Sequence, residues 1–182
     1  MACDLTKGRK EPCKDVVGGL KAVYFVDFGD LGTVTKTDDE ITDLSGTFSA
    51  YKYELKGGSS FEQAITSSRE NGTTFFDQTL SLSLKKLTKE DNKELKLLAY
   101  GRPHVAVEDY NGNVFLMGLA HGSDVNGGTI VTGAAMADLS GYTLTLNAQE
   151  LEPANFVSGA TAADPFAGMA SATATIIEGT NS

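Results

Sequence analysis

The chain contains no tryptophan and only two cysteines, two histidines and four prolines among its 182 residues. Few side chains are therefore available for a transition-metal site or for nucleophilic catalysis. No stretch approaches the roughly 20 apolar residues that a membrane-spanning helix requires, so no membrane partner is expected. No apolar run follows the charged residues of the N-terminus, so a secretory signal is not expected either, and we expect synthesis and folding in the cytoplasm.

Basic residues are also scarce, since 15 Lys and Arg stand against 24 Asp and Glu and give a net charge of −9. Static binding to DNA or RNA is disfavoured, because it depends on cations that displace counterions from phosphates. Brief contact remains compatible, because a surface past which DNA slides without adhering is acidic by the same physics. Excess carboxylate also serves simply to keep a protein in solution, and both interpretations stay open.

Glycine is plentiful, with 20 residues, and nine Phe and six Tyr supply bulk for a core or an interface. So many glycines indicate many tight turns, more than a helical bundle would need, which suits a mainly β fold. The length fits one domain with a real core. We expect a polar N-terminal arm over 1–15, a β domain over 16–153, and a C-terminal arm or edge strand over 154–182.

Cys3 and Cys13 lie ten residues apart in the expected arm. A small disulfide loop and a pair of metal ligands are both possible at this spacing. We expect two reduced thiols, because the chain is expected to fold in the cytoplasm and no histidine is near.

The clearest β pattern lies in the first half of the chain. Leu20–Asp27 is rich in β-branched and aromatic residues and predicts a strand, whereas 29–46 is expected to be a loop with at most a short strand at Thr33–Thr35. From Thr47 the period is two, with Tyr51, Tyr53 and Leu55 on one face. A long hairpin over 60–86 is predicted around the turn signal Asn71-Gly72.

One segment departs from the β pattern. Thr88 with Asp91 three residues later is typical of a helix start, and Gly101 with Pro103 ends the pattern, so we predict a helix over 89–100. After it we expect a second hairpin over 104–119, a loop or irregular strand over 121–135, and a strand over 140–147. A strand-like piece at 172–177 is the expected edge strand or arm on a neighbouring subunit.

No catalytic, cofactor or metal site emerges from the sequence. His104 and His121 are the only histidines, and Ser123 lies on no sharp Gly-x-Ser-x-Gly turn. Asp109-x-Asn111-x-Asn113 begins like a calcium loop, but Val114 and Ala120 stand where Gly and Glu belong. The other carboxylates form no pair distinguishable from solvated turns, and neither a phosphate-binding loop nor a dinucleotide motif is present.

The order of elements resembles the phage tail-tube family and its relatives in virion rings and secretion tubes. The resemblance is carried by the hairpin Phe61–Leu84, the helix Thr88–Tyr100 directly after it, and the hairpin Val105–Leu119 with the strand Gly141–Leu151. These segments cover about half of the chain. No diagnostic motif accompanies them, so the likeness is one of pattern.

The resemblance implies a mainly β subunit, a β-sandwich or barrel with a long hairpin and one flanking helix. It also implies a virion structural protein that assembles with itself into hexameric rings, which stack into a DNA conduit. Other tail or neck proteins would be partners, and DNA would pass without sequence-specific binding. Thr79, Ser81 and Ser83 would face the lumen, with the leucines between them on the core. The segment 29–46, including Asp38, Asp39 and Glu40, and the two termini would contact the next ring.

Two other classes remain as alternatives. A β-rich binding module, such as a capsid-decorating or fibre-associated domain, would present an exposed patch made of Tyr51, Tyr53 and Tyr110. An enzyme, the least favoured class, would require a pocket that joins His104 or His121 to a carboxylate, and Asp77 and His121 would be the first residues to test.

Overall fold

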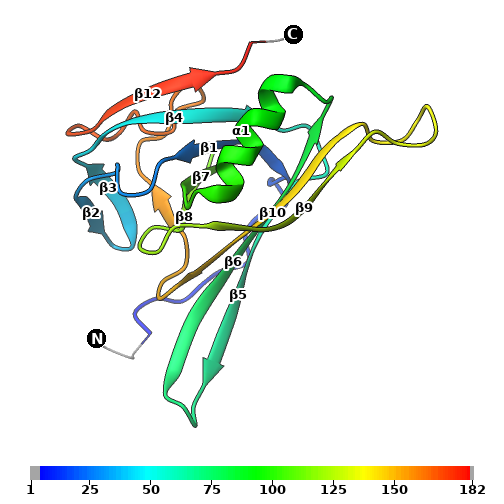
Figure 1. Cartoon of the computed structure of the whole chain (residues 1–182). Helices are drawn as coiled ribbons and strands as arrows, with labels where there is room; N and C mark the ends of the chain where they lie inside the picture. Colours follow the sequence, from blue (N-terminus) through cyan, green and yellow to red (C-terminus); the bar gives the residue numbers. More distant parts are fainter. Residues whose placement is uncertain (1–4, 181–182) are drawn as a thin grey trace.

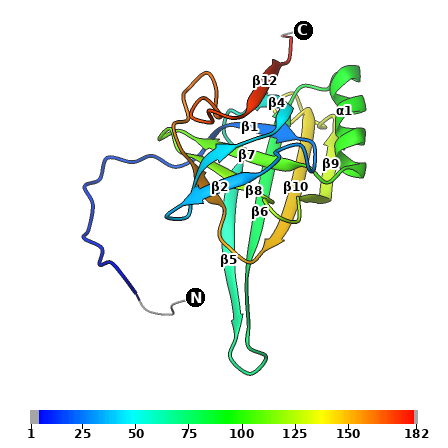
Figure 2. The same cartoon turned by 90° about the vertical axis from the view of Figure 1, so that its left-hand side faces the viewer.

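The structure is a computed structural model that describes residues 5–180. Within this range the chain forms twelve strands and one helix, arranged in two sheets (Figures 1 and 2). Cys3, one of the two expected thiols, lies outside the described residues, and Cys13 is exposed in an extended N-terminal segment. The expectation of a mainly β fold with one helix is confirmed.

The larger sheet, sheet A, has eight strands. In spatial order they are β12 (Thr173–Glu178), β4 (Thr47–Glu54), β1 (Leu20–Val26), β7 (His104–Asp109), β8 (Val114–Met117), β11 (Asn155–Val157), β3 (Glu40–Leu44) and β2 (Val34–Thr37). Sheet B has four strands in the order β5 (Ser60–Ser68), β6 (Thr73–Lys85), β10 (Gly141–Glu150) and β9 (Asp124–Val131). The sheets do not close into a barrel, so the barrel alternative is wrong and the arrangement is sandwich-like.

The central strands β1 and β7 of sheet A are buried on both faces. Alternate residues of β1 enter different hydrophobic clusters, so that Tyr24 belongs to one and Val23 and Phe25 to the other. The first cluster is closed by Phe166 and Met169 from the segment before β12. The second lies between sheet A and sheet B, where Leu80 and Leu82 of β6 enter it. Burial on both sides explains why β1 is almost continuously apolar instead of alternating.

Helix α1 (Lys89–Tyr100) covers one end of the second cluster (Figure 1). Its N-cap is Thr88, whose side chain accepts a hydrogen bond from the Asp91 N–H, as the sequence predicts. Leu95 is buried and Leu98 packs on the cluster. Tyr53 lies against this region, and burial, followed by the charges of Glu94 and Asp91, raises the pKa of its hydroxyl to about 12.

The expected loop over 29–46 is in fact largely a hairpin of β2 and β3, so that expectation is wrong. Asp38 and Asp39 form its turn with φ of 51° and 60°, the left-handed conformation that a two-residue hairpin turn requires. Asp tolerates this conformation better than most residues, so the acidic run is itself a turn signal. All three acidic residues, Asp38, Asp39 and Glu40, are exposed at an outer end of sheet A.

The glycine-rich segment 121–135 contains a regular strand, β9, paired with β10. Of the two outcomes we expected there, loop or irregular strand, the strand is correct, and it carries a bulge opposite Thr145 and Leu146. Gly128 is required, because a Cβ there would lie 2.4 Å from the Thr143 carbonyl oxygen. Close backbone approach, and not flexibility, accounts for this glycine.

A buried carboxylate links the first cluster to the start of β1. Glu108 is 3% exposed and accepts a hydrogen bond from the Lys21 ammonium at 2.6 Å and another from the Tyr24 hydroxyl at 3.1 Å. Burial and the adjacent carboxylate raise the pKa of the Tyr24 hydroxyl far above its usual value. Glu108 therefore depends on two donors from one neighbouring strand.

Replacing Lys21 by Met should destabilise the fold by about 2 kcal/mol, because the buried Glu108 charge loses its counter-ion. Urea unfolding followed by circular dichroism measures this loss. The Lys21→Met, Glu108→Gln double variant should recover much of it, because a neutral amide needs no counter-ion. Equal losses in the single and double variants would contradict the assignment.

Candidate functional site

Sheet B has one hydrophobic face and one polar face. Leu80 and Leu82 are buried against the body, whereas Thr79, Ser81 and Ser83 are partly exposed on the opposite side. The register extends this polar face across the sheet, because Thr145 lies opposite Ser81 and Thr143 opposite Ser83. We call it the open face. Neither hydrophobic cluster includes a residue of the open face.

Some polar side chains of the open face hydrogen-bond to one another. Thr129 and Thr143 share a hydroxyl–hydroxyl bond of 2.6 Å, and the Asn147 amide donates to Asp77 at 2.5 Å. Glu62, Asp77 and Asp124 give the face acidic charge, and Lys85 lies at its rim with its ammonium on the Lys56 carbonyl. The result is a hydroxyl-rich, weakly acidic surface.

Both lateral edges of sheet B lack a neighbouring strand in the described chain. β5 is one edge and β9 is the other. The three antiparallel pairings between them mean that β5 and β9 run in opposite directions. The two strands are also staggered, because β5 lies opposite residues 73–81 of β6, whereas β9 lies opposite the first part of β10. Unpaired edges of this length are templates for another chain.

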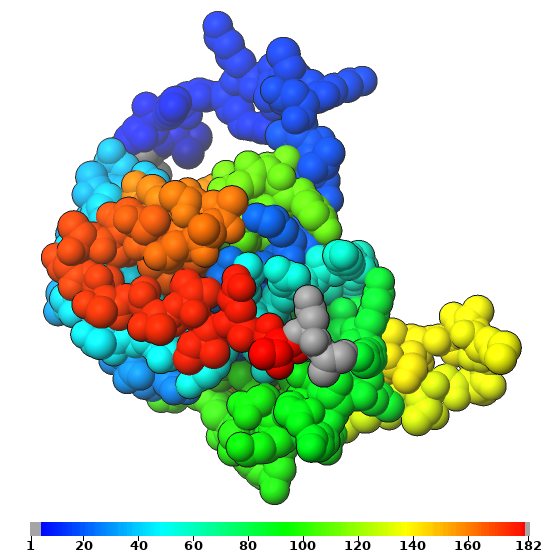
Figure 3. All heavy atoms as spheres, turned by 90° about the horizontal axis from the view of Figure 1, so that it is seen from above, coloured from blue at the N-terminus to red at the C-terminus, as the bar shows by residue number. Residues whose placement is uncertain are grey.

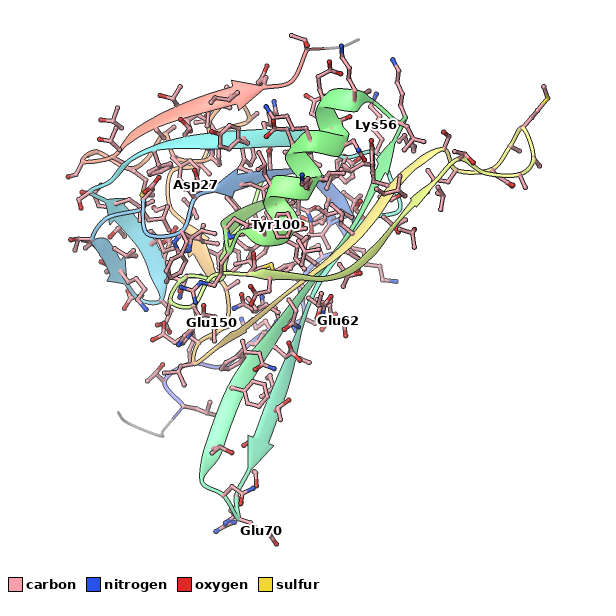
Figure 4. All side chains as sticks on the ribbon, viewed as in Figure 1. Asp27, Lys56, Glu62, Glu70, Tyr100 and Glu150 are labelled. Carbon is pink, nitrogen blue, oxygen red and sulfur yellow. The ribbon has the colours of Figure 1, made fainter. Side chains whose placement is uncertain are left out.

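Sheet B extends beyond the body at both ends. The β5–β6 hairpin projects from the sandwich, with Glu62 near the body and Glu70 at the tip (Figure 4). At the other end the loop between β9 and β10 projects sideways (Figure 3). That loop is ordered by Asp138, whose carboxylate accepts from the Ala134 and Ala135 N–H groups, and these bonds lower the pKa of Asp138.

His104 has a structural role. Its Nδ1 donates to the Gly118 carbonyl at 2.6 Å and its Nε2 accepts from the Gly29 N–H at 3.1 Å, which requires the neutral ring. Phe28 stacks on the ring at 5.0 Å. Burial lowers the pKa of His104 below its usual value, in agreement with the neutral tautomer. His104 joins no carboxylate in a pocket.

His121 does lie in a pocket with a carboxylate, the arrangement that an enzyme would require. The hollow has a volume of about 150 Å³ and includes His121, Glu150, Lys36 and Glu152. Glu150 is buried and accepts from the Ala120 N–H, the His121 N–H and the His121 Nδ1 at 2.8–3.0 Å. These three donors make Glu150 an anchor for the β8–β9 connection.

Nothing beside this pair completes a catalytic set in the described residues. Ser123 is buried with its hydroxyl on the Pro103 carbonyl, and Asp77 lies on the open face with Asn147. Residues 5–180 contain no group of three or more His, Cys, Asp or Glu side chains suited to a metal ion. No helix in that range is long and apolar enough to span a bilayer.

The calcium-like run is a self-contained hairpin turn. The Asp109 carboxylate accepts from the N–H groups of Asn111 and Asn113 at 2.9 and 2.8 Å and from both side-chain amides. Burial raises the pKa of Asp109, but these four hydrogen bonds outweigh it and the pKa falls below its usual value. Asn111 also binds both backbone groups of Val17 and so fixes the point where the N-terminal segment leaves the body.

The three tyrosines of the binding-module alternative do not form one patch. Tyr51 lies opposite Phe25 at the end of β1, whereas Tyr110 follows Asp109, which lies opposite Leu20 at the start of β1. Tyr53 is only partly exposed and packs edge-on against Phe25, with 5.2 Å between the ring centroids. The surface that would distinguish a binding module is therefore divided between two ends of the sheet.

Comparison of the chain with protein-family models, with curated proteins and with solved structures gives no match. The description of the site therefore depends on the chain's own geometry.

Acid should weaken the fold through His104. The pKa of His104 is about 6.5 in the unfolded chain and lower in the folded chain. The contribution of the neutral His104 to the free energy of unfolding is therefore complete above pH 6.5 and is lost as the pH falls towards the folded pKa. Melting temperatures measured between pH 7.5 and pH 5 check this. In the His104→Gln variant this part of the pH dependence should disappear, and an unchanged slope would contradict the assignment.

Proposed function

We propose that the chain is a virion structural protein, a phage tail-tube subunit that assembles with itself into rings, hexameric in the family it resembles. The rings would stack into a conduit for DNA. The observation that carries the proposal is sheet B, which combines a hydroxyl-rich open face with two unpaired edges that run in opposite directions.

Opposite directions at the two edges favour a ring. Copies related by rotation about one axis keep the same orientation, so β5 of one copy meets β9 of the next in an antiparallel sense. Each copy offers one of each edge, so the contact is heterologous, and such contacts close into a ring when the rotation permits. Closure pairs both edges of sheet B in every copy at once. The stagger of the sheet suits strands tilted against the axis, as in barrels.

The distribution of bulk favours an inward open face. Sheet A and α1 both lie on the hydrophobic side of sheet B, and the open face carries no further layer of the fold. When sheets are joined edge to edge, the bulky sides crowd each other and the sheet curves away from them. The open face then lines the inside, with Thr79, Ser81 and Ser83 towards the lumen.

The chemistry of the open face suits the passage of DNA. Its carboxylates repel phosphates, and Thr129, Thr143 and the Asn147 amide already have hydrogen-bond partners within the sheet. Adhesion to the duplex would require Lys or Arg side chains along the strands, and Lys85 lies at the rim. Contacts between rings, and with other tail or neck proteins, are assigned to the Asp38–Glu40 turn and the N-terminal and C-terminal segments.

Negative-stain imaging and light scattering of the purified chain test the proposal. Rings or tubes with a central channel are expected, with a mass that is a fixed multiple of 19.2 kDa. A strict monomer at high protein concentration would overturn it, because every subunit carries both edges.

The lumen assignment predicts selective protection at position 81. In a Cys3→Ser, Cys13→Ser background, Ser81→Cys should react with a small maleimide in assembled tubes but slowly with a polymer-linked maleimide too bulky for the channel. Lys96→Cys on the exposed side of α1 is the matched control and should react with both. Equal reaction of the bulky reagent at the two positions in tubes would place Ser81 on the outside.

A further inference from the structure

A hollow lies beside the β5 edge, on the body side of sheet B. Its volume is about 390 Å³, and Val17, Leu20, Phe61, Gln63, Asp109 and Phe115 are among the residues around it. Phe61 contacts Phe115 at 6.2 Å, and Phe115 contacts Phe156 at 4.6 Å, between ring centroids. Apolar side chains thus surround a space at the side of the molecule where a neighbouring strand is missing.

The opposite edge of the same sheet carries an exposed apolar side chain. Ile130 of β9 is 64% exposed, although its opposite neighbour Tyr142 is buried. Ile130 therefore projects from the body face of sheet B, the same face on which Phe61 lies opposite the buried Leu80. The exposed Ile130 side chain, which we call the knob, and the hollow beside Phe61 therefore lie on the same face of sheet B, at its two unpaired edges.

We propose that Ile130 of one copy fills the hollow beside Phe61 of the next copy, which fixes the register of the ring contact. The inference rests on the proposed ring. Because one of the eight β9 residues lies in the bulge, β9 overlaps the nine residues of β5 fully in three antiparallel registers, which place Ile130 opposite Phe61, Glu62 or Gln63. Matching of faces excludes Glu62, because a one-residue slip exchanges the two faces. The apolar ring of Phe61 beside the hollow then favours Phe61 over the polar Gln63.

The same register accounts for other features of the two edges. On the open face, Glu62 comes opposite Thr129, and both are exposed in the single chain. Beyond the β9 bulge, Ile65, which is 70% exposed, comes beside Val125 on the body face. Ile65 and Ile130, which are both exposed in a single copy, would thus each gain an apolar neighbour from the next copy.

Cross-linking tests the register directly. In the Cys3→Ser, Cys13→Ser background, Glu62→Cys with Thr129→Cys should be joined by a short thiol-to-thiol cross-linker, since opposite residues have Cβ atoms about 5 Å apart. The expected product is a ladder of covalent oligomers that ends at the ring size. Glu62→Cys with Asp124→Cys is the control on the same two edges, displaced by about 13 Å along the strand because the β9 bulge leaves four positions between Thr129 and Asp124, and should not be linked.

The knob is tested by Ile130→Ser, which should require at least about tenfold more protein for assembly, because the buried apolar contact is lost. Ile130→Val should assemble nearly as well as the unaltered chain. Leu97→Ser on the exposed side of α1 is the matched control and should have no effect on assembly. The melting temperature of the single chain should not change, because Ile130 has little cover there.

The outcomes separate the inference from the function beneath it. Imaged rings in which Glu62→Cys links to Asp124→Cys, or to neither position, would overturn the register and leave the ring proposal intact. Rings that form normally with Ile130→Ser would overturn the role of the knob. An unaltered chain that stays monomeric would overturn the proposed function, and the inference with it.

Discussion

Burial of the centre of sheet A on both faces is the constraint on which the rest of the structure depends. β1 and β7 are apolar on both sides, and a sheet of this kind must be covered twice. The segment before β12 covers one face with Phe166 and Met169, and sheet B covers the other with α1. Sheet B is thus held in place as a covering layer, by one of its faces only.

That role leaves sheet B with properties of its own. Because one face is sufficient to cover sheet A, the other is free to carry threonine, serine and asparagine in strict alternation with the buried leucines. Because no further element is needed for the core, both of its edges stay unpaired in the single chain. The rigid sandwich positions these surfaces, and the long β6 strand extends them beyond the body. The candidate site is therefore a consequence of the layering and needs no special chemistry.

Prediction from the sequence succeeded where local signals and burial agree. The alternation in 73–85 defines β6, and Thr88, Asp91 and Gly101 define α1 within a residue, because capping and period two are properties of neighbouring residues. It failed at Asp38 and Asp39, where we took acidic residues for a loop and their left-handed conformation makes a tight turn. Gly128 of β9 is explained only by Thr143 and Leu144 of another strand, which local sequence does not reveal.

The candidate site was predictable in part for the same reason. The leucine and hydroxyl faces of β6 follow from its sequence, but the edges of a sheet follow from strand order, which is set by contacts far apart in the chain. The hollow beside Phe61 requires residues from the start of β1, from β5 and from β8. The pairing of His121 with Glu150 likewise joins residues 29 positions apart. The spacing of residues along the sequence does not indicate such long-range contacts.

The negative charge of the chain produces a repulsion between copies that any assembly must overcome. A net charge of −9 on each copy makes the copies repel one another, so association has to come from contacts that charge does not weaken. The proposed backbone hydrogen bonds between β5 and β9 of neighbouring copies, and the proposed apolar contact at Ile130, are of this kind. In the proposed ring the carboxylates of the open face would lie around one channel, where salt screens their repulsion over about 8 Å. The same acidity that opposes assembly would keep DNA from adhering to the channel wall, so both effects come from one feature of the composition.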